Sequence, residues 1–261
     1  MDRTDGFSLR RCAAHLGLLA LLCLAGAGLR PAPALAASPS PPPVLVLNTD
    51  GAPPHSRPDG TGFEDRIVLE AFRRIGVVAR LVQLPSERAL RNADQGVDDG
   101  NYVRIAGLSA LYPNLVMVPE PMSEFRFTVF TRDPALAPAD WDSLRPLRVG
   151  IVNGWKLAEQ HLQSAPQLTK VRDEEALFAL LDKDRVQAVV ASQHSGWAVV
   201  HAHGYQGLHA VQPPLAVLPM YVYLNKKHAA LVPRLAQALR SMRADGSLQR
   251  LTRAGLGETK P

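Results

Sequence analysis

Short runs of apolar, β-forming residues alternate along this chain with segments that have the periodicity of an amphipathic helix. The run VLVLN at 44–48 is followed by a loop rich in Gly and Pro over 49–62. From Phe63 to Ile75 an apolar residue recurs at every fourth position, and Gly76 then offers a helix stop. A second apolar run, VVARLVQL, comes directly afterwards. A strand, a helix and a second strand in this order predict an α/β fold.

The alternation continues over the rest of the chain. The tetrad TGFE, Thr61 to Glu64, has the form of a capping box for the first helix. A second helix is expected from Ser86 to about Gln95, and a last helix tolerates Pro233 if this residue lies in its first turn. Further strands are expected over 98–105, 125–131, 147–155 (with a Gly turn and a helix start), 186–192 and 215–225.

The beginning of the chain has the pattern of an export signal. A pair of arginines at 10–11 precedes an apolar run over 13–29, and the small-residue motif ALA follows at 34–36. Glycines within the run and prolines after it distinguish this segment from a membrane-spanning helix. We therefore expect cleavage after Ala36 or Ala37 and export to the periplasm.

The two cysteines, Cys12 and Cys23, both precede the expected cleavage site. No disulfide is then expected in the mature chain, so hydrophobic packing must hold its fold. Cys23 follows Leu21 and Leu22 rather than small residues, which are the usual surroundings of a lipid-anchored cysteine. We therefore expect no lipid anchor.

Composition, length and charge indicate how the rest of the chain is organised and which partners to expect. Residues 1–36 are expected to be the signal peptide, and residues 37–43 (ASPSPPP) an extended Pro-rich linker. The remainder is long enough for two lobes of about 100 residues each. The whole chain carries 29 Lys and Arg against 24 Asp and Glu, a scattered net charge of +5. We therefore expect neither nucleic acid nor a membrane surface as its partner.

Several phrases of the sequence occur in a characteristic order. They are VLVLNTDGAPP, GFEDRIVLEAFRRIG, LPSERAL, GVDDG, LYPNLVMVPEPM, RVGIVNGW and the ending PMYVYLNKKHAALVPRLAQALRSMRADGSLQRL. In this order they resemble the type 2 periplasmic solute-binding proteins, the extracellular receptors of ABC-type importers, and among them the amino-acid receptors. The resemblance implies two α/β lobes, joined by crossing hinge strands, that close on a small solute.

The resemblance also implies how the chain is divided and what it meets. Lobe 1 would comprise residues 44–128 and 216–261, and lobe 2 residues 129–215. A monomer without a cofactor is expected, with a membrane permease or a sensor kinase as its partner.

In open α/β sheets, ligands bind beyond the carboxyl ends of the strands, where loops and helix N-termini meet. This rule and the resemblance together predict a small, anionic or zwitterionic solute. The candidate solute contacts are Asp50, Arg88, Arg104, Asn153, Trp155 and Ser192.

The arginines each have two interpretations. Arg104 follows the DDG turn near the end of an expected strand, where its guanidinium can hold a carboxylate through two parallel hydrogen bonds. The alternative for Arg104 is an ion pair at the surface or within the lobe, for example with Asp98 or Asp99. Arg88 lies just inside a helix start, and the alternative for it is a position on the surface.

The other candidates are open in the same way. Asp50 can bind an amino group of a solute or form a turn before Gly51. Trp155 follows the turn at Asn153 and can stack on a ligand or pack in the core. Ser192 and its neighbour Gln193 are neutral, whereas amino-acid receptors of the family commonly have an acidic residue in this region. This difference argues against an α-amino acid as the solute.

Metal binding and catalysis find little support in the sequence. His194, His201, His203 and His209 are close in sequence, but their spacing does not place them on one helix face, and we expect no metal site. The motifs Gly-x-Ser-x-Gly, His-Glu-x-x-His and Gly-x-x-x-x-Gly-Lys do not occur, so we expect no enzyme.

Two alternatives remain open. One is a dehydratase-like or lyase-like enzyme in the same cleft, with Glu87 or Glu120 as a carboxylic acid of raised pKa. The other is a diverged signalling module that transports no solute.

Overall fold

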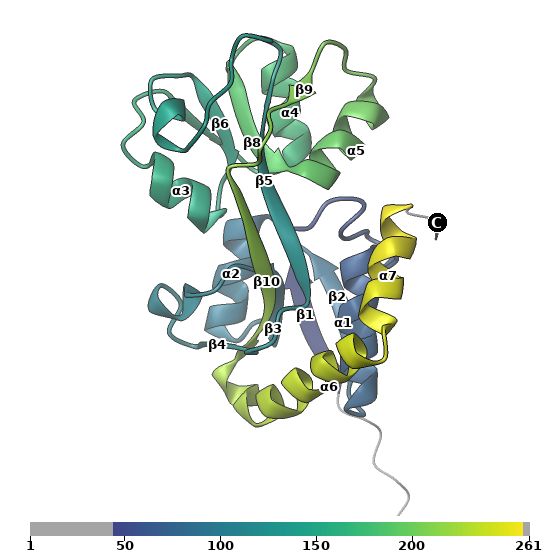
Figure 1. Ribbon diagram of the computed structural model, residues 1–261. Helices are drawn as coiled ribbons and strands as arrows, with labels where there is room; N and C mark the ends of the chain where they lie inside the picture. The colour runs from purple at the N-terminus through teal and green to yellow at the C-terminus, as the bar shows by residue number, and fades with distance from the viewer. Residues whose placement is uncertain (1–43, 258–261) are drawn as a thin grey trace, which may run out of the picture. The chain divides into compact units, whose positions relative to one another are not determined.

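Two long antiparallel strands cross the middle of the molecule and join its two α/β lobes (Figure 1). These strands are β5 (Ser123–Thr131) and β10 (Ala216–Asn225). This computed structural model describes residues 44–257. The expected signal peptide and the linker at 37–43 therefore lie outside the described residues.

The first lobe holds the parallel strands nearest the beginning of the described chain. Its elements are β1 (Val44–Thr49), α1 (Phe63–Arg74), β2 (Val78–Gln83), α2 (Ser86–Gln95), β3 (Gly100–Arg104), β4 (Leu115–Met117), α6 (Val232–Ala244) and α7 (Ser247–Leu256), with 3-10 turns at Leu108–Ala110 and Lys226–Leu231. The sheet runs β2–β1–β3–β10, and β4 also pairs with β10. β1 is parallel to β2 and β3, whereas β10 is antiparallel to β3.

The second lobe continues the same sheet beyond the crossing strands. Its elements are β6 (Val149–Val152), α3 (Lys156–Leu162), β7 (Leu168–Val171), α4 (Glu174–Asp182), β8 (Ala188–Ser192), α5 (Gln193–His203) and β9 (His209–Ala210), with a 3-10 turn at Asp142–Leu144. The order here is β10–β5–β8–β6–β7, with β6 parallel to β7 and β8. The expected α/β fold with two lobes and crossing strands is thus confirmed, while the lobe boundaries given above stay predictions.

The apolar runs of the sequence form the interior. Every residue of β6 and β8 is buried, as expected for parallel strands covered by helices on both faces. In the first lobe α7 packs on α1. Gly255 approaches so closely there that a Cβ at position 255 would lie 2.2 Å from the Phe63 Cβ. The C-terminal helix is therefore an integral part of the first lobe.

The start of α1 differs from the expected capping box. The Gly62 N–H donates to Oδ2 of Asp65 at 3.0 Å, so Asp65 rather than Glu64 caps this helix. Thr61 bonds Asp59 instead. Glu64 is buried and contacts the buried His55 of the same lobe instead. Pro233 lies in the first turn of α6, as expected.

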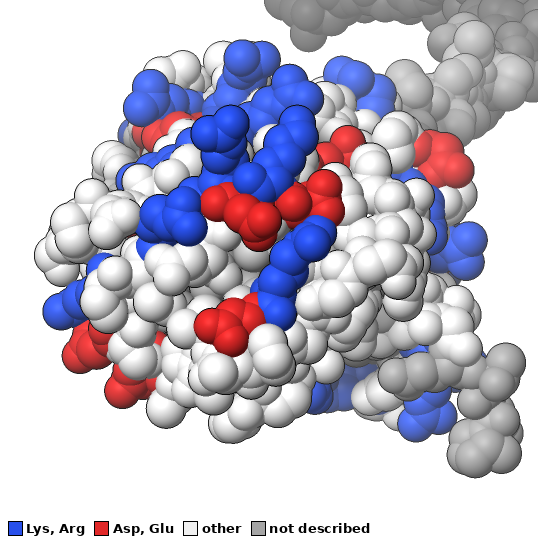
Figure 2. Space-filling view, turned by 90° about the horizontal axis from the view of Figure 1, so that it is seen from above, with Lys and Arg blue, Asp and Glu red and all other residues white. Residues whose placement is uncertain are grey.

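The face over the second lobe, seen from above in Figure 2, carries Lys and Arg side chains with Asp and Glu side chains among them. Ion pairs in this lobe include Arg145 with Asp142 and Lys170 with Glu159. Charges of both signs therefore alternate on this face. Among residues 44–257, none of the helices has the length and apolar character needed to cross a membrane.

Candidate solute-binding site

A cavity lies between the lobes, beside the crossing strands. Its empty space is about 570 Å³ when the solvent at its mouth is counted. Its apolar lining includes Leu90, Leu108, Phe125, Phe127, Trp155 and Met220. Its polar lining includes Asp50, His55, Arg104, Lys156, Glu174 and Ser195. The cavity thus combines an apolar wall with a few charged groups, as small-molecule sites commonly do.

Arg104 enters the cavity because the backbone before it departs from a regular strand. Val103 has a φ of +62°, a region that β-branched residues rarely adopt. Opposite this position, the register of β10 shifts between Tyr221 and Tyr223. Such an irregularity breaks the alternation of side chains along a strand and redirects the next side chain. Arg104 is accordingly only 6% exposed and lines the cavity.

The Arg104 guanidinium is held by groups of the first lobe. Nη1 lies 2.9 Å from both Oδ1 of Asp50 and Oγ of Ser86, and Nε donates to Oδ1 of Asn101. Nη2 is buried and has no hydrogen-bond partner among residues 44–257. One donor face of the guanidinium therefore remains available to a ligand in the cavity.

Asp50 links Arg104 to the second lobe. Its Oδ2 accepts a hydrogen bond of 2.9 Å from Nε1 of Trp155, which precedes α3. The structure thus brings together three of the predicted contacts. The alternative of an ion pair within the lobe holds as well, since Arg104 pairs with Asp50, but the partners named for it do not, since Asp98 bonds Asn48 and Asp99 pairs with other groups.

Three predicted contacts do not line the cavity, and two of these, Arg88 and Asn153, are exposed. Arg88 is exposed on α2, because Ala89, Leu90 and Ala93 form the buried face of this helix. Arg88 therefore lies at the surface, as in the alternative interpretation, and outside the lining of this cavity. Asn153 is exposed as well, and its N–H is bonded to the Val171 carbonyl, so it too lies outside the lining.

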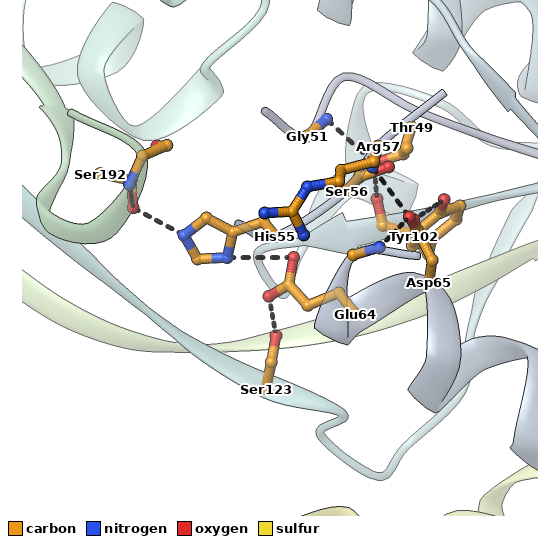
Figure 3. Close-up of polar contacts among 12 residues, drawn as sticks. Thr49, Gly51, His55, Ser56, Arg57, Glu64, Asp65, Tyr102, Ser123 and Ser192 are labelled. Atoms are coloured by element: carbon orange, nitrogen blue, oxygen red, sulfur yellow. Dashed lines mark hydrogen bonds and ion pairs between the residues drawn. The ribbon is translucent and has the colours of Figure 1, made fainter. Parts of the chain in front are cut away.

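Ser192 lies behind the cavity and contacts a residue that the sequence did not single out. Figure 3 shows the imidazole of His55 between the Ser192 hydroxyl and the Glu64 carboxylate. Nε2 of His55 is 2.9 Å from Oγ of Ser192, and Nδ1 is 3.2 Å from Oε2 of Glu64. Oε1 of Glu64 accepts a bond of 2.5 Å from Ser123. His55 therefore bridges the two lobes.

The charge of His55 depends on this burial and on its acidic neighbours. Burial by itself lowers the pKa of His55, but the attraction and hydrogen bond of Glu64, together with the charge of Glu174, raise it above its ordinary value. His55 is 1% exposed, so little water screens these interactions. The contact with Glu64 therefore favours the protonated form of the imidazole.

Glu174 is the second residue that sequence reasoning missed. It is the first residue of α4, and its Oε1 accepts hydrogen bonds from Oγ of Ser195 at 2.8 Å and from the Ser192 N–H at 3.2 Å. Burial raises the pKa of Glu174 to about 7, although these bonds and the charge of His55 act in the opposite direction. The acidic segment at 173–175 was the only signal, and it is also typical of an ordinary helix start.

The acids proposed for a cleft enzyme lie elsewhere or have other partners. Glu87 receives Nζ of Lys156 at 2.7 Å across the mouth of the cavity and Nε of Arg91 at 2.9 Å. Burial alone would raise the pKa of Glu87, but these cations lower it. The expected raised pKa at Glu87 is therefore wrong. Glu120 is ion-paired with Arg243 and lies outside the lining of the cavity.

The histidines of the second lobe are dispersed. His201 stacks on Trp197, and His203 stacks on Tyr205. His194 lies 6.0 Å from His55, measured between ring centroids. Within the part of the chain that the structure describes, His, Cys, Asp and Glu side chains nowhere form a group of three suited to a metal ion.

Comparison with solved structures addresses the fold. A histidine kinase sensor domain with similarity to periplasmic binding proteins superimposes with a TM-score of 0.72 at 16% identity, covering 85% of this chain and 99% of the other. An ancestral arginine-binding protein bound to glutamine gives 0.70 at 18% identity, covering 82% and 98%. The substrate-binding protein of an amino acid ABC transporter gives 0.67 at 15% identity, covering 81% and 98%.

The chain has the fold of a type 2 periplasmic binding protein. A sequence relative from Shewanella oneidensis, named only as an uncharacterized protein, is 26% identical over 191 residues, which are 70% of this chain and 72% of the relative. No family model matches the sequence. The cavity lies beside the crossing strands of this fold, where side chains of both lobes line it.

Proposed function

We propose that this chain is a receptor that captures a small solute with a carboxylate group between its lobes. The buried, unpaired Nη2 of Arg104 in the cavity carries this proposal. A buried guanidinium nitrogen without a partner is costly, and a carboxylate or carbonyl oxygen of a solute would satisfy it. The known structures with the same fold named above, from a transporter and from a sensor kinase, support a role in solute binding.

Closure of the lobes is the proposed mechanism. A solute bonded to Arg104 and packed on Trp155 contacts both lobes, and it therefore favours the closed arrangement over an open one. We place the lobe boundaries at 44–128 with 216–261, and at 129–215. The partner would be a membrane permease or a sensor kinase that recognises the closed form. Solute-dependent ATP hydrolysis would identify the permease, and solute-dependent autophosphorylation would identify the kinase.

Export belongs to the same proposal. We propose that residues 1–36 direct the chain to the periplasm and are then removed. Determination of the N-terminal residue of the exported protein checks this directly, and Ala37 or Ser38 is the expected result. A mature protein that keeps Met1 would contradict it.

A thermal-shift screen of amino acids, organic acids, polyamines and sugars tests solute binding. A solute at one hundred times its dissociation constant should stabilise the folded protein by about 2.7 kcal/mol. Arg104→Lys keeps the positive charge but loses the forked donor geometry, so the affinity for a carboxylate solute should fall at least about tenfold.

Arg88→Ala is the matched control, because this exposed arginine lies outside the cavity and its loss should leave the affinity unchanged. An Arg104→Lys variant with wild-type affinity would remove Arg104 from the site. Turnover of the solute, followed by mass spectrometry, would favour the enzyme alternative.

A further inference from the structure

Two buried asparagines lie side by side in the sheet of the first lobe. Asn48 belongs to β1 and Asn101 to β3, and the two residues are directly opposite each other in the parallel pairing of these strands. Both are 0% exposed. Buried parallel strands normally consist of apolar residues, as the buried neighbours Leu45 and Leu47 illustrate. Two fully buried amides at this position therefore call for an explanation.

The hydrogen bonds of the two amides form one continuous chain. Nδ2 of Asn48 donates to Oδ2 of Asp98 at 2.6 Å and to the Ala89 carbonyl at 3.0 Å. Nδ2 of Asn101 donates to the Asn48 carbonyl at 3.1 Å and to Oδ1 of Asn48. Oδ1 of Asn101 accepts a hydrogen bond from Nε of Arg104. The chain thus begins at Asp98 and ends at the Arg104 guanidinium.

The chemistry of the two ends fixes the direction of this chain. A carboxylate and a backbone carbonyl only accept hydrogen bonds, whereas a guanidinium only donates them. Asn48 must therefore turn its nitrogen toward Asp98 and its oxygen toward Asn101. Asn101 must in turn direct its own oxygen toward Arg104. Rotation of either amide by 180° would place two donors or two acceptors against each other, so each side chain is held in one orientation by its neighbours.

We propose that Asn101 and Asn48 are positioning residues, which hold Arg104 so that its free Nη2 faces the cavity. This inference rests on the proposed function. Arg104 is held at Nε by Asn101 and at Nη1 by Asp50 and Ser86, so Nη2 is the nitrogen left for a solute. An orientation that is fixed before binding reduces the entropy lost when the solute binds.

An amide at position 101 serves this purpose better than a carboxylate. Arg104 already pairs with Asp50. An aspartate at position 101 would place a second negative charge beside the same guanidinium and would repel a carboxylate in the cavity. The neutral oxygen of Asn101 holds Nε without adding charge. The identity of residue 101 should therefore affect the binding of acids more than the binding of neutral solutes.

Hydrogen exchange at the Arg104 side chain tests the positioning without any solute. The Nε–H signal of Arg104 is identified by NMR from its loss in Arg104→Lys. Asn101→Ala should speed the exchange of this hydrogen with water at least about tenfold, because the hydrogen bond to Oδ1 is lost. Exchange in Asn101→Ala as slow as in the wild type would overturn the inference.

Asn92→Ala is the matched control for this measurement. Asn92 also donates to Oδ2 of Asp98, at 3.2 Å, but it lies on a branch of the network that does not lead to Arg104. The exchange of the Arg104 Nε–H should therefore be the same in Asn92→Ala as in the wild type. Equal acceleration in Asn92→Ala and Asn101→Ala would overturn the specific role of Asn101.

Two probes of the same shape separate positioning from a merely structural role. They are 3-phenylpropanoate and its neutral amide, 3-phenylpropanamide, which suit the apolar wall of the cavity and are titrated by calorimetry. The ratio of their affinities reports the geometry and charge of Arg104, whereas a general loss of structure would weaken both alike. Asn101→Ala should lower the acid-to-amide ratio at least about tenfold, and Asn92→Ala should leave it unchanged.

Asn101→Asp is a second variant, which decides the matter if Asn101→Ala does not fold. It keeps the shape of the side chain and an acceptor for Nε of Arg104. The Nε–H should therefore stay protected, while the acid-to-amide ratio falls at least about tenfold through the added charge. An unchanged ratio would overturn the role assigned to the amide. If neither probe binds the wild type, the proposed function fails for a solute of this kind, and the exchange measurement still decides the positioning by Asn101.

Discussion

At the scale of single residues, two buried groups bind protons more tightly in the folded protein than in the unfolded chain. Burial raises the pKa of Glu174 from its ordinary value of 4.5 to about 7. The pKa of His55 is raised too, because Glu64 and Glu174 outweigh the effect of burial. A raised pKa contributes stability that is complete below the unfolded-state value and is lost as the pH rises through the folded-state value. The free energy of unfolding should therefore fall between about pH 4.5 and pH 7 for Glu174, and above about pH 6.5 for His55.

The variant Glu174→Gln measures how much of the fall in the free energy of unfolding with pH is due to Glu174. The glutamine cannot ionise. Between pH 5 and pH 8 the free energy of unfolding of the wild type should therefore fall by up to about 3 kcal/mol more than that of the variant. Urea unfolding at pH 5, 6, 7 and 8 provides the measurement, with Glu175→Gln as the control for loss of one acidic residue. Parallel pH profiles in Glu174→Gln and the wild type would show that Glu174 is not buried in its charged form.

Only some of the residues that line or adjoin the cavity could be predicted from the sequence. Asp50, Arg104 and Trp155 could be found, because they follow strands whose apolar runs are evident in the sequence. His55 could not, because it lies in a loop rich in Gly and Pro, and side chains of both lobes come together around it only in the folded protein. Arg88 could have been excluded, since Ala89, Leu90 and Ala93 already mark the other face of its helix as buried.

At the scale of elements, the turn between β6 and α3 sets how closely the lobes approach. Gly154 in this turn has a φ of +97° and lies against the start of α2. A Cβ at this position would be 2.5 Å from the Glu87 backbone nitrogen and 2.8 Å from the Ser86 Oγ. The backbone of α2 cannot move aside as easily as the end of a flexible side chain can. The absence of a side chain here therefore permits contact between the lobes.

We expect Gly154→Ala to hold the lobes apart. The solute affinity should fall at least about tenfold, because only a fraction of the molecules could close. Gly204→Ala is the matched control: Gly204 also has a positive φ, of +66°, but no atom within 4 Å of an added Cβ. Both variants should lose about 1 kcal/mol of stability, but only Gly154→Ala should lose affinity in calorimetry. Equal affinities would show that the turn does not limit closure.

At the scale of the whole molecule, polar contacts connect the lobes without any solute. His55 bonds Ser192, Trp155 bonds Asp50, and Lys156 pairs with Glu87. The last pair lies at the partly exposed mouth and contributes about 1 kcal/mol or less. Together these contacts stabilise the closed arrangement. A bound solute therefore has to add only a little to the free-energy difference between the closed and open arrangements.

The double variant Trp155→Phe with Lys156→Gln should shift the protein toward an open form. It keeps an aromatic ring in the cavity but removes two of these three polar contacts. Small-angle X-ray scattering should show a larger radius of gyration than in the wild type, and a bound solute should reverse the increase. Lys170→Gln, which removes a lysine paired only within the second lobe, should leave the radius unchanged. An unchanged radius in the double variant would mean that these contacts do not hold the lobes together.

The arrangement of the lobes itself was predictable to a large extent. Continuous apolar runs identified the strands, and their order resembled one family of two-lobed proteins, whose fold the solved structures share. The start of α1 was not predictable from local pattern, because Glu64 turns to His55 and leaves the capping bond to Asp65. A tertiary contact within the first lobe overrules the local preference at that point.

The position of β10 in the sheet has a consequence for the synthesis of the protein. β10 lies between β3 and β5, yet it is made last of all the strands that the structure describes. While the ribosome is still adding residues before Ala216, β3 and β4 lack the strand with which they pair, whereas β6, β7 and β8 already have all of their neighbours. The half of the molecule that emerges in the middle of translation can therefore fold first, and the half that emerges first must wait for the end of the chain.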